Sequence, residues 1–460
     1  MAAPVLESSA SNPSTASPQT FRILVLPGDH VGPEVMDEAL RVLDTVEITS
    51  QGRLKFEFNH QICGGCSIDK HGTPITDEVL RIAKEESDAV LFGSVGGPKW
   101  GTTYPNPESG LLRLRQHLDA FANIRPCTFY SRSLIPLSPL KPSIAEGTNF
   151  ILLRENCGGA YFGPKVEEAD FASDSWAYGR KEIERCARVA AALATTMGKD
   201  GKGTGTCPEG PATVWSSDKA NVLASGRLWR KVTSEVFANE FPHVELKHQL
   251  ADSLSMLMVK NPRMFNGVIH TDNTFGDMLS DQAGGVVGTL GVLPSASLSG
   301  IPDGKTRCNG IYEPVHGSAP DIAGKGIVNP VAQILSAAMM LRYSFNLAAE
   351  AAAIEAAVEK VLDGKDLGGL EIRSGDLGGT ASTKEVGDAV CSVLEELLMG
   401  NSTGIPEKVN GDASTIGPNA TAGQTTTTTT IPTHAKDNKK WEEKLEKEGV
   451  PTGPREALAL

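Results

Sequence analysis

The sequence predicts an α/β fold, in which the strands of a sheet are connected by helices. A short apolar run ends in turn residues at residues 21–29, and a helical pattern begins at about Pro33. The same order of strand, turn and helix returns further along the chain, which is typical of sheets with helical crossovers. With 460 residues, 40% of them hydrophobic, the chain can bury a core large enough for two domains.

The elements follow in order. Residues 54–58 (LKFEF) predict a strand, residues 77–86 a helix, and residues 88–97 (DAVLFGSVGG) a buried strand that runs into a glycine-rich turn. After residue 121 the pattern mixes short strands with a long helix over residues 180–197. We interpret this part as an inserted second domain, after which loops and long helices return from Leu290.

Domain boundaries follow from these changes of pattern and from low-complexity segments at both ends. Residues near the C-terminus contain TTTTTT and a charged stretch. These segments have too few apolar residues to offset, by burial, the conformational entropy that folding would cost. The predicted parts are a disordered arm at residues 1–20, a discontinuous domain at residues 21–120 plus 288–398, an inserted domain at residues 121–287 and a disordered tail at residues 399–460.

Composition excludes several classes of function. A net charge of −13 argues against a nucleic-acid or anionic membrane partner, and no apolar run approaches the roughly 18 residues needed to cross a bilayer. Eight cysteines without a second CxxC or a histidine pair at zinc spacing indicate reduced thiols, including Cys63 and Cys66 of the CGGC. The first 20 residues lack Arg and Lys, unlike a mitochondrial presequence, so we expect a cytoplasmic protein.

Two aspartates point to a metal ion. Asp277 and Asp281 lie four residues apart in an apolar pattern, a spacing that places both carboxylates on one face of a helix. Buried acids need a partner, and oxygen ligands suit Mg²⁺ or Mn²⁺, although such a pair is also compatible with a solvated helix face. Arginines and a lysine elsewhere in the chain would complement an anionic substrate.

A glycine-rich segment is the best candidate for a nucleotide site. No Rossmann GxGxxG follows a strand in this sequence. Residues 313–330 (EPVHGSAPDIAGKGIVNP) instead combine glycines, which permit close backbone approach, with the polar groups of His316 and Asp321. By composition alone, a surface connection is the favoured interpretation, since glycine and proline are common in any loop.

The amino-acid sequence of that segment closely resembles the cofactor loop of the β-decarboxylating dehydrogenases that act on isopropylmalate, isocitrate and related 2-hydroxy acids. The resemblance runs in order from about Phe21 to Leu398, through LPGDHVGPEV, GSVGGPKWG, GLLRLRQHLDAFANIRP and SSDKANVLASGRLWRKV. It implies a two-domain fold with a central mixed sheet flanked by helices. It also makes residues 21–120 plus 288–398 the cofactor-binding domain, and residues 121–287 the domain for substrate, metal and dimerisation.

The resemblance also implies roles for individual residues. Tyr161 and Lys219 match the acid and base groups of the family. The substrate carboxylates would be bound by Arg115, Arg125 and Arg154, and Mg²⁺ or Mn²⁺ by Asp252, Asp277 and Asp281, of which Asp252 would also contact the substrate. In the family, the equivalents of Lys219 and Asp252 come from the neighbouring subunit, so a homodimer is expected.

Cofactor and substrate follow from the same resemblance. NAD would be held by His316, Gly317, Ser318, Ala319, Asp321 and Asn329, and the Asp321 carboxylate would repel the 2′-phosphate of NADP. The side-chain pocket is matched at Glu108, Leu111, Leu112 and Val222, whose apolar members suit an isopropyl group. The implied reaction is the oxidative decarboxylation of (2R,3S)-3-isopropylmalate to 4-methyl-2-oxopentanoate and CO₂, a step of leucine biosynthesis.

Some positions depart from the family pattern, and they leave alternatives open. Asn156 and Cys157 stand between Arg154 and Tyr161, where apolar residues are common, and the loop at residues 198–211 is longer than usual. One alternative is therefore the same reaction on a bulkier 3-substituted malate in a specialised pathway. Another is a non-catalytic paralogue retained as a binding partner.

Overall fold

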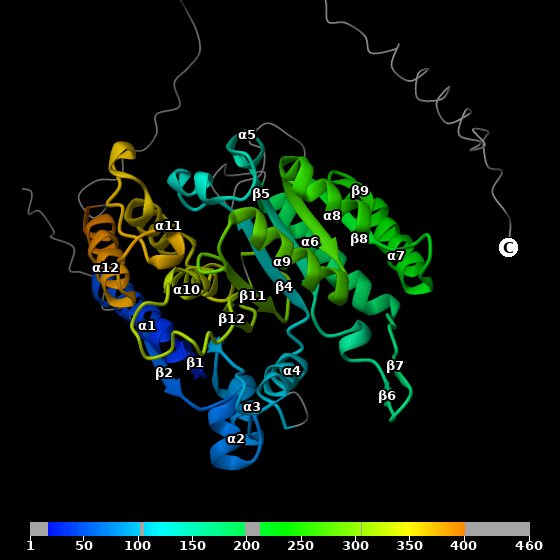
Figure 1. Cartoon of the computed structure of the whole chain (residues 1–460), viewed down its shortest axis with the longest axis horizontal. Coiled ribbons are helices and arrows are strands. Elements are labelled where there is room, and N and C mark those ends of the chain that lie inside the picture. The colour runs from blue at the N-terminus through cyan, green and yellow to red at the C-terminus, as the bar shows by residue number, and fades with distance from the viewer. Residues whose placement is uncertain (1–16, 102–104, 198–211, 305, 401–460) are drawn as a thin grey trace, which may run out of the picture. The chain divides into compact units, whose positions relative to one another are not determined.

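The computed structural model describes residues 17–101, 105–197, 212–304 and 306–400. One mixed sheet of ten strands organises them, and Figure 1 shows its strands running through the middle of the helices. Its strands, in spatial order, are β2 (Leu54–His60), β1 (Gln19–Gly28), β3 (Ala89–Ser94), β12 (Gly310–Pro314), β11 (Pro294–Leu298), β4 (Ala122–Thr128), β5 (Asn149–Glu155), β10 (Gly267–Thr271), β8 (Thr213–Asp218) and β9 (Glu245–Leu250).

The direction of pairing changes in the middle of the sheet. From β2 to β12 and from β5 to β9 neighbouring strands are parallel, whereas β11 and β4 run antiparallel to both of their neighbours. Parallel strands need long crossovers, and helices supply them. The predicted mixed sheet is therefore confirmed, and its antiparallel centre contains the strands that carry Arg125 and Arg154.

Helices lie on both faces of the sheet. The longer helices are α1 (Gly32–Thr49), α4 (Pro107–Leu118), α6 (Arg180–Met197), α7 (Ala224–Glu240), α8 (Ala251–Lys260), α9 (Asn273–Val287), α10 (Val331–Tyr343), α11 (Ala348–Leu362) and α12 (Thr383–Gly400). The short helical segments are α2 (Gly65–His71), α3 (Asp77–Arg81), η1 (Ile82–Glu86), η2 (Arg132–Leu137), α5 (Pro142–Ala145), η3 (Gly159–Tyr161), η4 (Pro262–Phe265), η5 (Lys365–Leu367) and η6 (Gly375–Leu377).

Alternation along β1 explains why both faces are covered. Ile23 and Val25 point into a core shared with α1, α10, α11 and α12, and Leu24 and Leu26 point into a second core with α3 and α4. All four side chains are buried, as expected when successive residues of a strand face opposite sides of a sheet. Figure 1 shows α1 and α12 side by side, in agreement with their contacts.

The strands β6 (Lys165–Glu167) and β7 (Ala172–Asp174) form a separate two-stranded hairpin. All six of their residues are exposed, and Figure 1 shows the hairpin extending away from the sheet. Phe171, in the turn of the hairpin, exposes 58% of its surface. This apolar side chain is thus exposed on a hairpin that lies outside the ten-stranded sheet.

Sequence prediction placed most elements correctly, with small differences. The first strand begins at Gln19 instead of residue 21, the helix predicted over residues 77–86 changes from α to π at Ile82, and α12 ends at Gly400. Residues 1–16, 198–211 and 401–460, which contain most of the predicted arm, the long loop and most of the predicted tail, lie outside the described residues. In the described part, no helix is long and apolar enough to span a membrane.

Candidate active site

Three arginines from three elements meet at the centre of the sheet. Arg115 lies on α4, Arg125 on β4 and Arg154 on β5. Burial, followed by the charge of Arg125, lowers the pKa of Arg154 to about 10, and burial also lowers the pKa of Arg125. Like charges that influence one another in this way lie close together, so the sequence-predicted trio is gathered into one cationic cluster.

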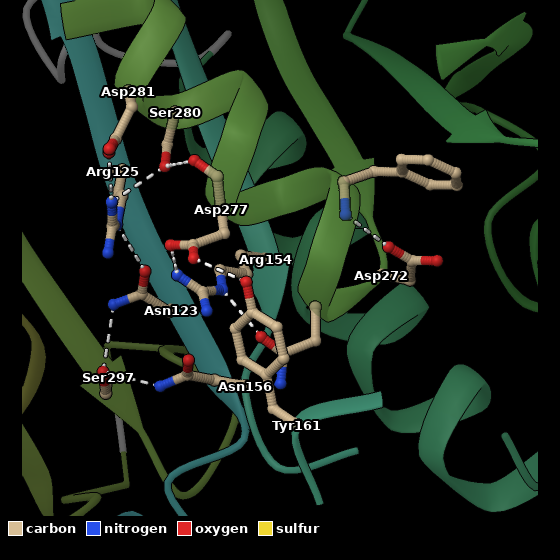
Figure 2. Close-up of polar contacts among 12 residues, drawn as sticks. Asn123, Arg125, Arg154, Asn156, Tyr161, Asp272, Asp277, Ser280, Asp281 and Ser297 are labelled. Atoms are coloured by element: carbon tan, nitrogen blue, oxygen red, sulfur yellow. Dashed lines mark hydrogen bonds and ion pairs between the residues drawn. The ribbon is translucent and has the colours of Figure 1, made fainter. Parts of the chain in front are cut away.

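The carboxylate of Asp277 lies between Arg154 and Tyr161, as Figure 2 shows. Arg154 Nη1 donates to Asp277 Oδ1, and the Tyr161 hydroxyl donates to Asp277 Oδ2 over 2.8 Å. Burial acts to raise the pKa of Asp277, but the charge of Arg154 and the tyrosine hydrogen bond outweigh it and hold the pKa below its usual value. Burial and the bond to Asp277 raise the pKa of Tyr161, so its proton is retained at neutral pH.

Asp281 lies one helical turn beyond Asp277 on the same side of α9. Arg125 Nη1 lies 3.4 Å from Asp281 Oδ1 and 2.8 Å from the hydroxyl of Ser280. The side chain of Asp281 is 69% exposed, whereas that of Arg125 is 13% exposed. The two predicted metal ligands of this helix therefore lie beside the cationic cluster, with one carboxylate held by it and the other open to solvent.

Local sequence fixes the position of α9. The Asp272 side chain caps its N-terminus by accepting from the backbone N–H of Phe275 over 2.9 Å. At Gly276, a Cβ atom would lie 2.6 Å from Cγ of Arg154. The absence of a side chain thus lets the helix approach β5 closely enough for Asp277 to reach Arg154.

A buried ion pair connects α4 to the strand that enters the glycine-rich segment. Arg115 Nη2 lies 2.5 Å from Glu313 Oε1, and both side chains are 9% exposed. Glu108, Leu111, Leu112 and Arg115 share one face of α4 by their spacing. Glu108 also approaches the glycine turn after β3, since a Cβ on Gly96 would lie 2.7 Å from its Oε1.

The segment from Glu313 to Pro330, here called the glycine loop, is held against α1 and the turn after β3. The backbone N–H of Val31 donates to the Ser318 carbonyl over 3.1 Å, and Ser318 Oγ donates to the Gly96 carbonyl over 3.1 Å. The Glu34 carboxylate accepts from the backbone N–H groups of Gly324 and Gly326 over 2.6 and 2.9 Å. Helix α1 therefore sets the shape of the glycine loop.

The remaining predicted cofactor residues differ in exposure. Asp321 and Gly317 are exposed, Ala319 is half-buried with a φ of 40°, and Asn329 is buried and donates to Asp376 over 3.1 Å. His316 Nδ1 lies 2.9 Å from the Gly317 carbonyl, while its Nε2 is buried and has no hydrogen-bond partner among the described residues. Burial lowers the pKa of His316, so its ring is neutral at physiological pH. Exposed polar groups beside an unpartnered ring nitrogen suit a polar ligand.

Lys219 and Asp252 pair with each other instead of joining the cationic cluster. Their Nζ and Oδ2 atoms lie 2.7 Å apart, and this hydrogen bond lowers the pKa of the exposed Asp252. Within the described residues, no group of three or more His, Cys, Asp or Glu side chains is placed to hold a metal. One chain therefore does not bring Asp252 to Asp277 and Asp281, and Val222, three residues after Lys219, is 63% exposed.

Several residues around the site were missed by sequence reasoning. Asn123 and Asn273 accept hydrogen bonds from Arg125 and Arg154, and Glu34 shapes the glycine loop. The sequence could have indicated Asn123, because residues two apart on a strand face the same side of the sheet and Arg125 is a predicted site residue. Asn273 and Glu34 had none, since their partners lie more than a hundred residues away in the sequence.

Comparisons with known proteins identify the family of the chain. The family model described as isocitrate/isopropylmalate dehydrogenase matches residues 22–390. A 3-isopropylmalate dehydrogenase of Hapsidospora chrysogena is 64% identical over 381 residues (83% of this chain, 98% of the relative), and one of Neurospora crassa is 52% identical over 382 (82% and 99%). The crystal structure of isocitrate dehydrogenase from Methylococcus capsulatus aligns with a TM-score of 0.66 at 30% identity, covering 82% of this chain and 99% of that one. The chain belongs to the isocitrate/isopropylmalate dehydrogenase family.

Proposed function

We propose that this enzyme oxidises 3-isopropylmalate with NAD and releases CO₂ to give 4-methyl-2-oxopentanoate, the dehydrogenase step of leucine biosynthesis. The observation that carries the proposal is the cluster of Arg115, Arg125 and Arg154 beside the Tyr161–Asp277 pair. Forked guanidinium donors suit the two carboxylates of a substituted malate. Relatives that are 64% and 52% identical and carry the name 3-isopropylmalate dehydrogenase support this substrate.

The chain's own groups move the protons. Lys219, directly or through a water molecule, would accept the proton of the C2 hydroxyl, and a bound nicotinamide would supply the acceptor for the hydride from C2. Loss of CO₂ from the 3-carboxylate of the resulting ketone leaves an enolate, and Tyr161 donates a proton to its C3. The raised pKa of Tyr161 keeps this proton available at neutral pH.

The residues present fit a divalent metal ion. Asp277 and Asp281 offer hard oxygen donors on one side of α9, and Asp281 is exposed. Asp252 of a second copy would complete the set. A bound Mg²⁺ or Mn²⁺ would supply positive charge to the C2 oxygen of the substrate.

The glycine loop fits a dinucleotide. Its exposed Gly317 and Asp321, the half-buried Ala319 and His316, whose Nε2 has no partner in the described part of the chain, lie on one segment. Ser318 and Asn329 fix the backbone of this segment. Asp321 would accept from the ribose hydroxyls and disfavour a 2′-phosphate, so we propose NAD instead of NADP.

A homodimer would complete the site. Met256 and Val259 on α8 are 58% and 47% exposed, and Met278 on α9 is 68% exposed. Exposed apolar side chains on neighbouring helices are typical of a surface that another subunit covers. A second copy there would bring its Lys219 and Asp252 to the cluster. The two-domain division and the cytoplasmic location remain predictions.

The test is NADH formation by the purified enzyme with Mg²⁺ and four substrates: 3-isopropylmalate, a benzyl-substituted malate, isocitrate and D-malate. We expect 3-isopropylmalate to give the highest kcat/KM and EDTA to abolish turnover. Preference for the benzyl-substituted malate would indicate that the enzyme acts in a specialised pathway. No turnover of any substrate, with NAD or NADP, would contradict the proposal and favour a non-catalytic paralogue.

A further inference from the structure

Two buried asparagines hold two of the arginines in the same way. Arg125 Nε donates to Asn123 Oδ1 over 2.8 Å, and Arg154 Nε donates to Asn273 Oδ1 over 2.9 Å. Neither asparagine side chain is exposed. Figure 2 shows Asn123 beside Arg125 on one side of the Asp277 carboxylate. Asn123 also lies opposite Arg154 in the β4–β5 ladder, so the three side chains share one face of the sheet.

Each asparagine is itself fixed by a second hydrogen bond. Asn123 Nδ2 donates to Ser297 Oγ over 3.0 Å, and Asn273 Nδ2 donates to the Gly158 carbonyl over 2.9 Å. The Gly158 carbonyl can only accept, so it determines which end of the Asn273 amide is the oxygen, and for Asn123 the Arg125 Nε–H, which can only donate, does the same. The amide oxygen therefore has to face the arginine.

The remaining contacts of the two arginines determine what is left for a ligand. Nη1 of Arg154 donates to Asp277, and Nη1 of Arg125 donates to Ser280 and Asp281. With Nε and Nη1 both held, the plane of each guanidinium group is fixed. In the part of the chain that the structure describes, Nη2 of neither arginine has a hydrogen-bond partner, so this nitrogen is the donor offered to a carboxylate.

An amide is suited to this role because it is neutral. A carboxylate at the same place would orient the guanidinium equally well but would cancel its charge, and the attraction for an anionic substrate would fall. Asp277 and Asp281 already place one carboxylate beside each arginine, and an amide oxygen accepts the Nε hydrogen bond without adding a second negative charge. The two asparagines thus orient the guanidinium groups of Arg125 and Arg154 without neutralising them.

We propose that Asn123 and Asn273 are positioning residues for substrate binding, which fix the planes of Arg125 and Arg154 while preserving their charge. The proposal rests on the proposed function, in which these arginines bind the substrate carboxylates. It assigns a role in substrate affinity to two residues that contact the substrate only through an arginine.

The decisive variant is Asn123→Asp. It keeps the size of the side chain and the acceptor for Arg125, and the Ser297 hydroxyl can turn to donate to the new carboxylate. Asn273→Asp is less suitable, because its second oxygen would face the Gly158 carbonyl, which cannot donate. We expect Asn123→Asp to raise the KM for 3-isopropylmalate about tenfold, comparable to losing one charge-assisted hydrogen bond, with little change in the KM for NAD.

Asn59→Asp is the matched control. Asn59 lies on β2 at the far edge of the sheet, and its Oδ1 accepts from Gln61 over 2.9 Å, so this variant adds the same charge away from the arginines. Its KM for 3-isopropylmalate should equal that of the wild type. Thermal unfolding of both variants tests whether the fold is kept, and Asn123→Ser, which keeps an oxygen without adding charge, should raise this KM less than Asn123→Asp does.

An unchanged KM for 3-isopropylmalate in Asn123→Asp would overturn the inference. So would a parallel rise of both KM values with a lowered melting temperature, since that pattern belongs to a structural role. If the wild type turns over no malate, the proposed function fails, and stabilisation by malate in thermal unfolding then replaces KM as the readout. A wild type stabilised by malate and an Asn123→Asp variant that is not would still support the inference; equal stabilisation would overturn it.

Discussion

Asp272 combines a structural role with an unusual charge state. It caps α9 through Phe275 and accepts from the Trp176 indole over 3.2 Å, yet it is only 8% exposed. Burial raises the pKa of its carboxyl from 3.8 to about 7. The folded protein therefore holds this proton up to a higher pH than the unfolded chain does.

This difference predicts the effect of pH on stability. The contribution of a raised carboxyl pKa is fully present below pH 3.8 and is lost as the pH rises through about 7. Asn cannot ionise and still accepts one hydrogen bond. The Asp272→Asn variant should therefore not lose this stability as the pH rises. From about pH 4 to about pH 7, its free energy of unfolding should fall less than that of the wild type, by an amount on the order of a few kcal/mol. Urea unfolding at several pH values measures this, and parallel curves for the two proteins would contradict it.

At the scale of elements, the close approach of α9 to β5 is what places Asp277. Gly276→Ala should displace Arg154, because the added Cβ would lie 2.6 Å from Arg154 Cγ. We expect a rise in the KM for the malate substrate and a loss of stability of about 1–3 kcal/mol from overpacking. Kinetics and thermal unfolding check both effects.

Gly285 on the same helix provides the control. No atom of the described residues lies within 4 Å of a Cβ added there. Gly285→Ala should therefore leave the KM unchanged and stabilise the protein by up to about 1 kcal/mol through helix propensity. Equal behaviour of the two alanine variants would show that the space at Gly276 is not needed.

The contact between α1 and the glycine loop makes a second prediction at this scale. Glu34→Ala removes the acceptor for the N–H groups of Gly324 and Gly326, so the loop loses its fixed shape. We expect the KM for NAD to rise about tenfold while the KM for the malate stays unchanged. Asp37→Ala, at an exposed acid on the same helix, is the control and should match the wild type in steady-state kinetics. A rise in the malate KM alone would contradict a role in the cofactor loop.

Sequence reasoning succeeded where the signal was local. Alternating apolar runs predicted the strands, and the spacing of Asp277 and Asp281 predicted two carboxylates on one side of a helix. It could not find that Asn273 would hold Arg154, because this contact needs β10 beside β5, a pairing between residues 117 positions apart. Nor could it predict that helix α3 would change to π geometry at Ile82. The spacing of apolar residues barely distinguishes an α-helix from a π-helix.

For the whole molecule, the separation of Lys219 from the arginine cluster predicts subunit complementation. Lys219→Ala and Asp277→Asn should each be inactive alone. If Lys219 acts on the site of a second copy, a mixed dimer contains one intact site, and random mixing of the two variants restores about a quarter of wild-type activity. NADH formation after joint refolding or co-expression measures this, and a mixture without activity would place both residues in a site made by one chain.

The continuous sheet has a consequence for attempts to divide the protein. The segment at residues 121–287 contributes β4, β5, β10, β8 and β9, and its strand β4 pairs with β11 from the other part of the chain. A fragment cut at these boundaries would leave β4 without its neighbour, and the complementary fragment would lose the partner of β11. Each would expose a new row of unsatisfied backbone groups in the middle of a former sheet, which promotes edge-to-edge association. Separate expression of the two parts should therefore yield aggregates, whereas their co-expression should allow the broken ladder to reassemble.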